Sequence, residues 1–220
     1  MIEENLKTIQ NTIPQGVTLV AVSKTKPIEL LKEAYAAGQR HFGENRVQEL
    51  DEKNAIMPAD IQWHMIGHLQ SKKVKKIAPF VHLIHGVDSI KLLKEINKQA
   101  LNNNRTIDCL LQFHIAQETT KFGFAFEEVE DFLKSRELIS LNNIRIIGVM
   151  GMASFSDNEA QVRSEFRILK EYYDRIKRNY GSDLNHFTEI SMGMSGDYKI
   201  AIEEGSTMVR VGSSIFGSRG

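Results

Sequence analysis

Short apolar runs alternate with longer stretches of helical periodicity along the whole chain. The first run, Val17–Ser23, is rich in β-branched residues and apolar almost throughout, which is typical of a parallel strand covered on both faces. A helical pattern follows it, with Pro27 at the expected first turn and Gly38 at the expected end. Later strand candidates are Gln39–Phe42, Ile61–Ile66, Val81–His85, Thr106–Ile115, Ile144–Val149, Phe187–Ile190 and Met208–Val211.

The clearest helical pattern predicts a long helix that begins with a capping box of Ser156 and Glu159 and ends at Gly181. Strand–helix alternation is typical of a parallel α/β sheet with helices packed outside it. Eight such units favour a single closed (β/α)8 barrel of the TIM type, capped by an extra helix at Ile2–Asn11. A doubly wound sheet has no fixed strand number, so periodicity alone leaves that fold open. Because no linker or repeat interrupts the pattern, we expect residues 1–220 to form a single domain.

Composition narrows the classes of partner. The 28 basic residues balance the 28 acidic ones, so no net charge favours nucleic acid or an anionic membrane. No run of 18 apolar residues occurs, and the first residues are acidic and polar, unlike a signal peptide. The single cysteine, Cys109, cannot form an internal disulfide. We therefore expect a cytoplasmic protein that binds neither nucleic acid nor membrane.

The end of the first predicted strand carries a candidate reactive group. Active sites of parallel α/β barrels lie at the carboxyl ends of the strands. Lys24 is the first ionisable side chain after the apolar run, and partial desolvation at a barrel mouth makes a lysine amine a better nucleophile toward carbonyls. An ordinary surface lysine at a strand end is the alternative, and this position alone does not decide between them.

Two glycine- and serine-rich segments, Ser191–Asp197 and Gly212–Gly217, follow the seventh and eighth predicted strands. Small residues before a helix leave backbone N–H groups available to an anion. Barrels often bind phosphate with the loops after these two strands. A reactive lysine facing a phosphate cradle suits pyridoxal 5′-phosphate (PLP), and it equally suits a lysine-type aldolase acting on sugar phosphates.

Ordered motifs along the chain carry a family resemblance: AVSKTKP (Ala21–Pro27), HFGENRVQE (His41–Glu49), WHMIGHLQSKK (Trp63–Lys73), TTKFGF (Thr119–Phe124), GVMGMA (Gly148–Ala153), SMGMSGD (Ser191–Asp197) and GSTMVRVGSSIFG (Gly205–Gly217). By these motifs the chain resembles the PLP homeostasis proteins, also called PLP-binding proteins. That family is similar to the N-terminal barrel of bacterial alanine racemases. The resemblance covers essentially the whole chain and implies a PLP fold type III barrel without the β-rich second domain of the racemases.

The resemblance implies a set of cofactor-binding residues: Lys24, Asn45, Ser195, Arg210, Gly212 and Ser213. Lys24 would form the Schiff base with PLP, Asn45 would lie near the ring, and Arg210 would face the pyridine nitrogen. The remaining three would contact the phosphate. In the family pattern, His64 and Met65 would line the mouth of the site.

The resemblance also implies a protein that buffers or delivers PLP in the cell without catalysis, with client PLP enzymes as partners. We expect a monomer, because the racemase second domain that builds the dimer is missing. An amino-acid racemase stays an alternative, although it needs a second base and all five tyrosines lie in predicted helices. A class I aldolase is a further alternative, with Glu44 as the only nearby acid.

The histidines and the lysine cluster have simpler interpretations. None of the seven histidines belongs to an HExxH motif, and Cys109 has no partner, so we expect no metal site. His82 and His85 lie three apart and are expected on opposite faces of a strand. The basic run Lys72–Lys76 has no interleaved aromatic residues, which favours a solvated helix face over an RNA contact.

Overall fold

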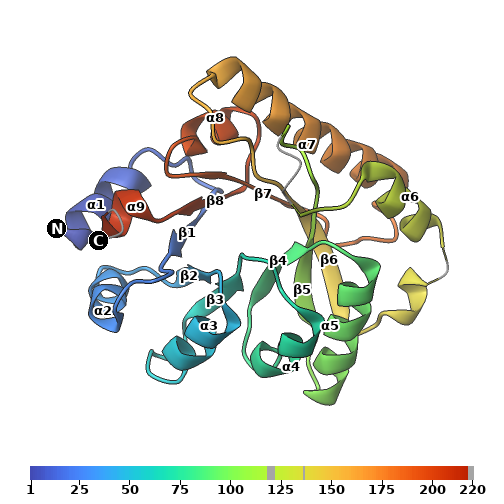
Figure 1. Cartoon of the computed structure of the whole chain (residues 1–220), viewed down its shortest axis with the longest axis horizontal. Coiled ribbons are helices and arrows are strands. Elements are labelled where there is room, and N and C mark those ends of the chain that lie inside the picture. The colour runs from blue at the N-terminus through green and yellow to red at the C-terminus, as the bar shows by residue number, and fades with distance from the viewer. Residues whose placement is uncertain (118–121, 136, 218–220) are drawn as a thin grey trace.

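Eight parallel strands in chain order close into a barrel in the computed structural model, which describes residues 1–117, 122–135 and 137–217 (Figure 1). The barrel closes where β8 pairs with β1, with Arg210 beside Val20. The predicted TIM-type barrel is therefore confirmed, and the doubly wound sheet is excluded because the sheet closes. The strands are β1 (Thr18–Val22), β2 (His41–Glu44), β3 (Gln62–Met65), β4 (Leu83–Val87), β5 (Ile107–Gln112), β6 (Ile144–Met150), β7 (Glu189–Met194) and β8 (Met208–Val211).

Helices surround the barrel as an outer layer (Figure 1). They are α1 (Ile2–Gln10), α2 (Ile28–Ala36), α3 (Val47–Asn54), α4 (Val74–Ile77), α5 (Ile90–Asn102), α6 (Phe126–Lys134), α7 (Glu159–Tyr180), α8 (Tyr198–Glu203) and α9 (Ser213–Phe216), with 3-10 turns η1 (Ser71–Lys73) and η2 (Leu138–Ser140). The first helix does not cap the barrel as predicted. It packs beside α2 and α9, and Asn5 Nδ2 donates a hydrogen bond to Ile215 O at 2.9 Å, because its buried apolar face finds a partner in this layer.

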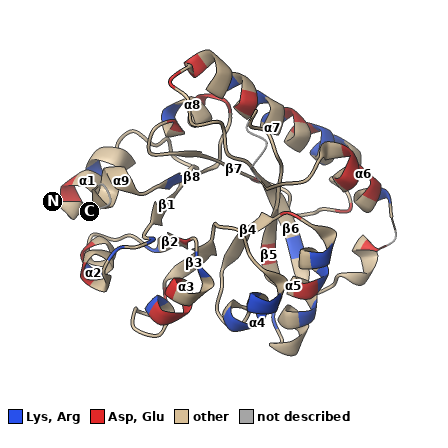
Figure 2. Cartoon of the chain, viewed as in Figure 1, with Lys and Arg blue, Asp and Glu red and all other residues tan. Residues whose placement is uncertain are grey.

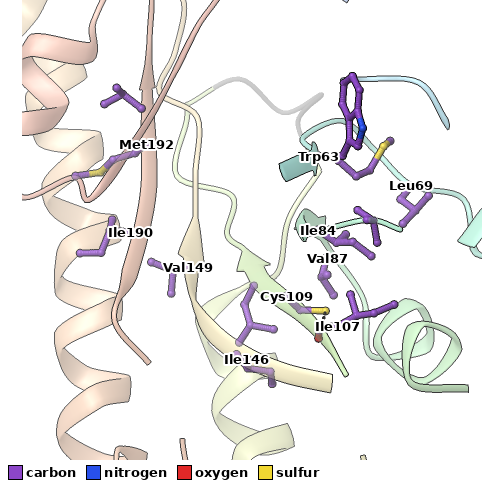
Figure 3. Packing of buried hydrophobic residues seen from close by; sticks show 14 of the residues in the cluster. Trp63, Leu69, Ile84, Val87, Ile107, Cys109, Ile146, Val149, Ile190 and Met192 are labelled. Atoms are coloured by element: carbon purple, nitrogen blue, oxygen red, sulfur yellow. Dashed lines mark hydrogen bonds between the residues drawn. The ribbon is translucent and has the colours of Figure 1, made fainter. Parts of the chain in front are cut away.

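Alternating side chains of the strands build two apolar layers. A small cluster fills the barrel interior: Val20, Leu83, Leu110, Met150 and Met208. A larger cluster lies between strands and helices, and Figure 3 shows part of it, with side chains from β3 to β7. There Cys109 is fully buried, and burial raises the pKa of its thiol far above the usual value. Most of the burial that stabilises the fold is thus in this outer layer.

Some predicted element boundaries shift. Strands β2, β4 and β7 continue beyond their predicted ends to Glu44, Val87 and Met194, because backbone hydrogen bonds do not require apolar side chains. The predicted capping box at α7 is wrong. Asn158, with an extended backbone, caps the helix by accepting from Gln161 N at 3.2 Å, and Ser156 Oγ instead accepts from Asn158 N at 3.1 Å.

Charged residues lie mainly on the outer helices (Figure 2). The lysines of the run Lys72–Lys76 lie on η1 and α4 and are all exposed. Within the described ranges, no helix combines the length and the apolar character needed to cross a membrane.

Candidate functional site

A pocket of about 430 Å³ opens at the carboxyl ends of the strands. Apolar side chains form part of its wall, among them Val22, Ile66, Met152 and Phe155. The pocket is also lined by every residue for which the resemblance implies a cofactor contact: Lys24, Asn45, Ser195, Arg210, Gly212 and Ser213. Residues separated by nearly the whole chain are therefore brought to one concave site.

Lys24 lies in a tight turn that directly follows β1. Lys26 N donates to Ser23 O at 3.0 Å, and Thr25 takes the left-handed conformation with φ 61°. Thr25 N also donates to Glu49 Oε2 at 2.7 Å, which ties the turn to α3. The backbone of the turn is thus held from outside the barrel, while the half-buried Lys24 lines the pocket.

A buried ion pair supports this turn. Lys53 Nζ donates to Glu44 Oε1 at 2.7 Å and to Ser23 O at 2.8 Å, and Ser23 Oγ donates to the same carboxylate oxygen at 2.6 Å. Burial raises the pKa of Glu44, and the Lys53 contact opposes the rise. Glu44, the acid that the aldolase alternative required, does not line the pocket. Its carboxylate instead accepts hydrogen bonds from Ser23 and Lys53 and stabilises the turn.

Arg210 is a buried cationic residue that lines the pocket. Its Nη1 donates to Ser191 Oγ at 2.6 Å and its Nη2 to Gly151 O at 3.1 Å. Burial lowers the pKa of Arg210 to about 10, with Asp197 opposing the shift, so the guanidinium is charged at neutral pH. Because a guanidinium has five N–H groups, donors remain for a ligand.

Arg210 ends a hydrogen-bonded series that crosses the barrel interior. Ser191 Oγ lies 2.8 Å from His85 Nδ1, and His85 Nε2 lies 2.9 Å from His64 Nδ1. His64 Nε2 then lies 3.0 Å from His41 Nδ1, near the amino ends of the strands. Burial lowers the pKa of His64 and of His85 well below the usual value, so both rings are neutral.

The predicted roles of His64 and Met65 at the mouth are wrong. Neither lines the pocket; Ile66 does. Side chains alternate along β3, so Trp63 and Met65 pack in the strand–helix core while His64 points into the barrel. Ile66, one step further, returns to the inner face at the carboxyl end of the strand.

The two glycine- and serine-rich segments lie side by side at the pocket. Gly212 N donates to Ser195 Oγ at 3.1 Å. The N–H groups of Ser213 and Ser214 open α9, where the first turn of a helix gives them no internal partner. A Cβ on Gly212 would lie 3.1 Å from Val22 O, so the absence of a side chain lets β8 end close against β1.

Glu165 is a supporting residue that the sequence pattern did not reveal. It lies 3% exposed on the apolar face of α7. Its carboxylate accepts from Ser154 N at 2.6 Å, Ser154 Oγ at 2.8 Å and Gln161 Nε2 at 3.1 Å. Gln117 N donates to it at 3.4 Å. The residue therefore joins the loops that follow β5 and β6, one of which presents Phe155 to the pocket.

The loop after β5 is only partly described. Thr119, Thr120 and Lys121 of the TTKFGF motif lie outside the described residues. Phe122 stacks on the His68 ring at 4.1 Å between centroids, and His68 Nδ1 lies 2.8 Å from Asp88 Oδ2.

Comparisons with known proteins agree on one family. The family model for the alanine racemase N-terminal domain matches residues 1–220. A pyridoxal phosphate homeostasis protein of Aquifex aeolicus is 40% identical over 202 residues, which cover 91% of this chain and 86% of the relative. The alanine racemase of Clostridium difficile 630 shares the fold, with a TM-score of 0.78 at 16% identity over 99% of this chain and 60% of the racemase chain.

Solved structures of PipY from Synechococcus elongatus are also similar. The structure without PLP has a TM-score of 0.92 and 35% identity, covering 99% of this chain and all of PipY. The structure with PLP bound has a TM-score of 0.86 and 34% identity over the same shares. By these matches, the chain belongs to the pyridoxal phosphate homeostasis protein family and has the fold of the alanine racemase N-terminal domain.

Proposed function

We propose that this protein binds PLP covalently at Lys24 and takes part in PLP homeostasis by buffering the cofactor and delivering it to client PLP enzymes. The observation that carries the proposal is the pocket that unites Lys24, Arg210 and the Gly212–Ser213 segment. The names of the Aquifex aeolicus relative and of the PLP-bound PipY structure support it. We propose further that the protein acts as a monomer in the cytoplasm.

The residues present fit this cofactor. The pocket volume lies within the range of small-molecule sites, with apolar walls and a few converging polar groups. Arg210 offers a buried donor for a ring nitrogen, and the N–H groups of Ser213 and Ser214 offer donors for a phosphate. Asn45 would lie beside the ring, and Ser195 would complete the phosphate contacts. When bound, PLP supplies an aldehyde that condenses with a lysine amine.

The same residues favour holding the cofactor over amino-acid chemistry. With a pKa of about 10, Arg210 keeps its proton at neutral pH, so it donates a hydrogen bond to a ring nitrogen without protonating it. No tyrosine lines the described pocket. Tyr198 OH lies 2.9 Å from Thr12 Oγ1, and Tyr35 OH donates to Asp60 Oδ1 at 2.8 Å, both in the outer layer. Among the described residues, therefore, no tyrosine is placed to act as the second base of a racemase.

A PLP titration followed by visible absorbance tests the proposal. Lys24→Ala should abolish the absorbance of covalently held PLP. Lys26→Ala is the matched control, because Lys26 also lines the pocket and its Nζ donates to Gly217 O at 2.9 Å. This variant should keep the absorbance with an affinity within about threefold, a change of well under 1.4 kcal/mol. Loss of the signal in Lys26→Ala alone would refute the assignment.

Deuterium exchange at Cα of added amino acids tests the non-catalytic part. The PLP-loaded protein should exchange alanine or serine no faster than free PLP does. Exchange at enzymatic rates that Lys24→Ala abolishes would establish the racemase alternative instead.

A further inference from the structure

A group of three histidines lies at the amino ends of the strands, at the opposite end of the barrel from the pocket. His41 begins β2, His64 lies within β3, and His82 immediately precedes β4. One ring nitrogen of each lies within 4.8 Å of the others. The ring centroids are 5.2 Å apart for His41 and His64, 5.4 Å for His64 and His82, and 6.0 Å for His41 and His82.

No sequence spacing reveals this group, because its members come from three neighbouring strands. Parallel pairing places His41 opposite Gln62 and His64 opposite Leu83, which brings the three rings together. None of the three lines the pocket that contains Lys24. The group therefore lies outside the pocket and outside the apolar clusters, although His64 is linked to Arg210 through His85 and Ser191.

We propose that His41, His64 and His82 bind one divalent transition-metal ion of the zinc class. Three neutral imidazoles with a free position are a known ligand set for zinc, cobalt, nickel and copper ions. His82 is exposed and His41 is half-buried, so an ion can enter from solvent and keep a water ligand.

The ring of His64 is already oriented for this role. Its Nε2 faces His41, and its Nδ1 lies 2.9 Å from His85 Nε2. With an ion on Nε2, the His64 ring proton would be on Nδ1 and would be donated to His85 Nε2, and the Nδ1–H of His85 would be donated to Ser191 Oγ. Metal-binding histidines commonly donate their second ring nitrogen in this way, which fixes both tautomer and ring direction.

Small adjustments complete the geometry. Zinc–nitrogen bonds of about 2.0–2.1 Å place two tetrahedral ligand nitrogens roughly 3.4 Å apart. The 3.0 Å between His41 Nδ1 and His64 Nε2 is already close to this value. The exposed His82 ring can move to bring its nitrogen within the same range.

Cobalt(II) titration of the tag-free full-length protein tests the proposal, because tetrahedral cobalt absorbs visible light. We expect one cobalt ion per chain, displaced by zinc. His82→Ala should weaken binding at least tenfold, whereas His186→Ala, which removes an exposed histidine away from the group, should not change it. Both changes are at exposed positions, so neither threatens folding.

Two further outcomes separate this proposal from the PLP site and from surface binding. Lys24→Ala should retain the cobalt spectrum in full, so failure of PLP binding does not decide the metal site. His41→Ala should weaken cobalt binding as His82→Ala does. Equal cobalt affinity in His82→Ala and the unchanged protein, or equal loss in His186→Ala, would overturn the proposal.

Discussion

Gly212 lies where β8 ends and the chain passes against β1. A Cβ there would lie 3.1 Å from Val22 O and 3.2 Å from Val22 Cβ, whereas a Cβ on Gly196, in the same pocket, would meet nothing within 4 Å. The missing side chain at Gly212 therefore brings the segment proposed to contact phosphate against the strand that leads to Lys24.

Gly212→Ala should force these two strand ends apart. Overpacking of this kind costs about 1–3 kcal/mol, so we expect a lower melting temperature and PLP binding weakened about tenfold. Gly196→Ala is the matched control and should change PLP affinity less than about twofold. The two variants are compared by thermal unfolding and by PLP titration. Equal losses of affinity in both would contradict the role given to Gly212.

Ser191 is the only described link between Arg210 Nη1 and the buried histidines. Ser191→Ala leaves a buried charged donor without its acceptor, which costs about 1–3 kcal/mol of unfolding free energy. Because Arg210 is then less firmly positioned, PLP should also bind more weakly.

Ser191→Thr keeps the hydroxyl and is the test of mechanism. It should restore PLP affinity toward the original value, as measured by titration, and urea unfolding should report the stability of each variant. If the alanine and threonine variants bind PLP equally weakly, the hydroxyl does not act through Arg210.

At the scale of elements, α7 holds the loops after β5 and β6 through the single carboxylate of Glu165, and the loop after β6 lines the pocket. Burial by itself raises the pKa of Glu165, but hydrogen bonds from Ser154, Gln161 and Gln117 outweigh it and leave the pKa below its ordinary 4.5. A carboxyl group with a lowered folded-state pKa contributes stability above its unfolded pKa, and this contribution is lost as pH falls through the folded value.

Glu165→Gln should therefore lower the unfolding free energy at pH 7 by about 1–3 kcal/mol. The difference from the unchanged protein should shrink as the pH falls below about 4.5. Chemical denaturation across this pH range measures both effects. Glu171→Gln, an exposed change on the same helix, is the control and should have little effect at any pH. A pH-independent difference for Glu165→Gln would show that its charge is not involved.

Elements differ in how well the sequence predicts them. The strand candidates overlap all eight strands, and most are rich in apolar residues because parallel strands are covered on both faces. Cap positions were harder, since Ser156 and Asn158 both suit an N-cap and only backbone conformation distinguishes them. The position of α1 depends on its packing against α2 and α9, and no local sequence pattern encodes a contact with the distant α9.

The candidate site was predicted as far as its motifs reach. Lys24, Arg210 and the glycine-rich segments lie in local patterns, and the structure brings them into one pocket. The residues that position this site could not be predicted from the sequence. The Lys53–Glu44 pair and the series from His41 to Ser191 join residues on separate elements, so only barrel closure makes them neighbours.

At the scale of the whole molecule, the two proposed binding sites lie at opposite ends of the barrel. The carboxyl ends of the strands carry the pocket proposed for PLP, and the amino ends carry the three histidines proposed for a metal ion. His85 and Ser191 connect the two ends through the interior. Charged residues lie mainly on the outer helices (Figure 2). Phe155, which lines the pocket, is fully exposed.

Borohydride reduction of the PLP-loaded protein followed by peptide mapping tests the central claim most directly. Reduction fixes PLP on the lysine that holds it, and tandem mass spectrometry distinguishes Lys24 from Lys26 within one peptide. The account predicts one label per chain, on Lys24. A label on Lys26, or labels spread over the exposed lysines, would contradict it.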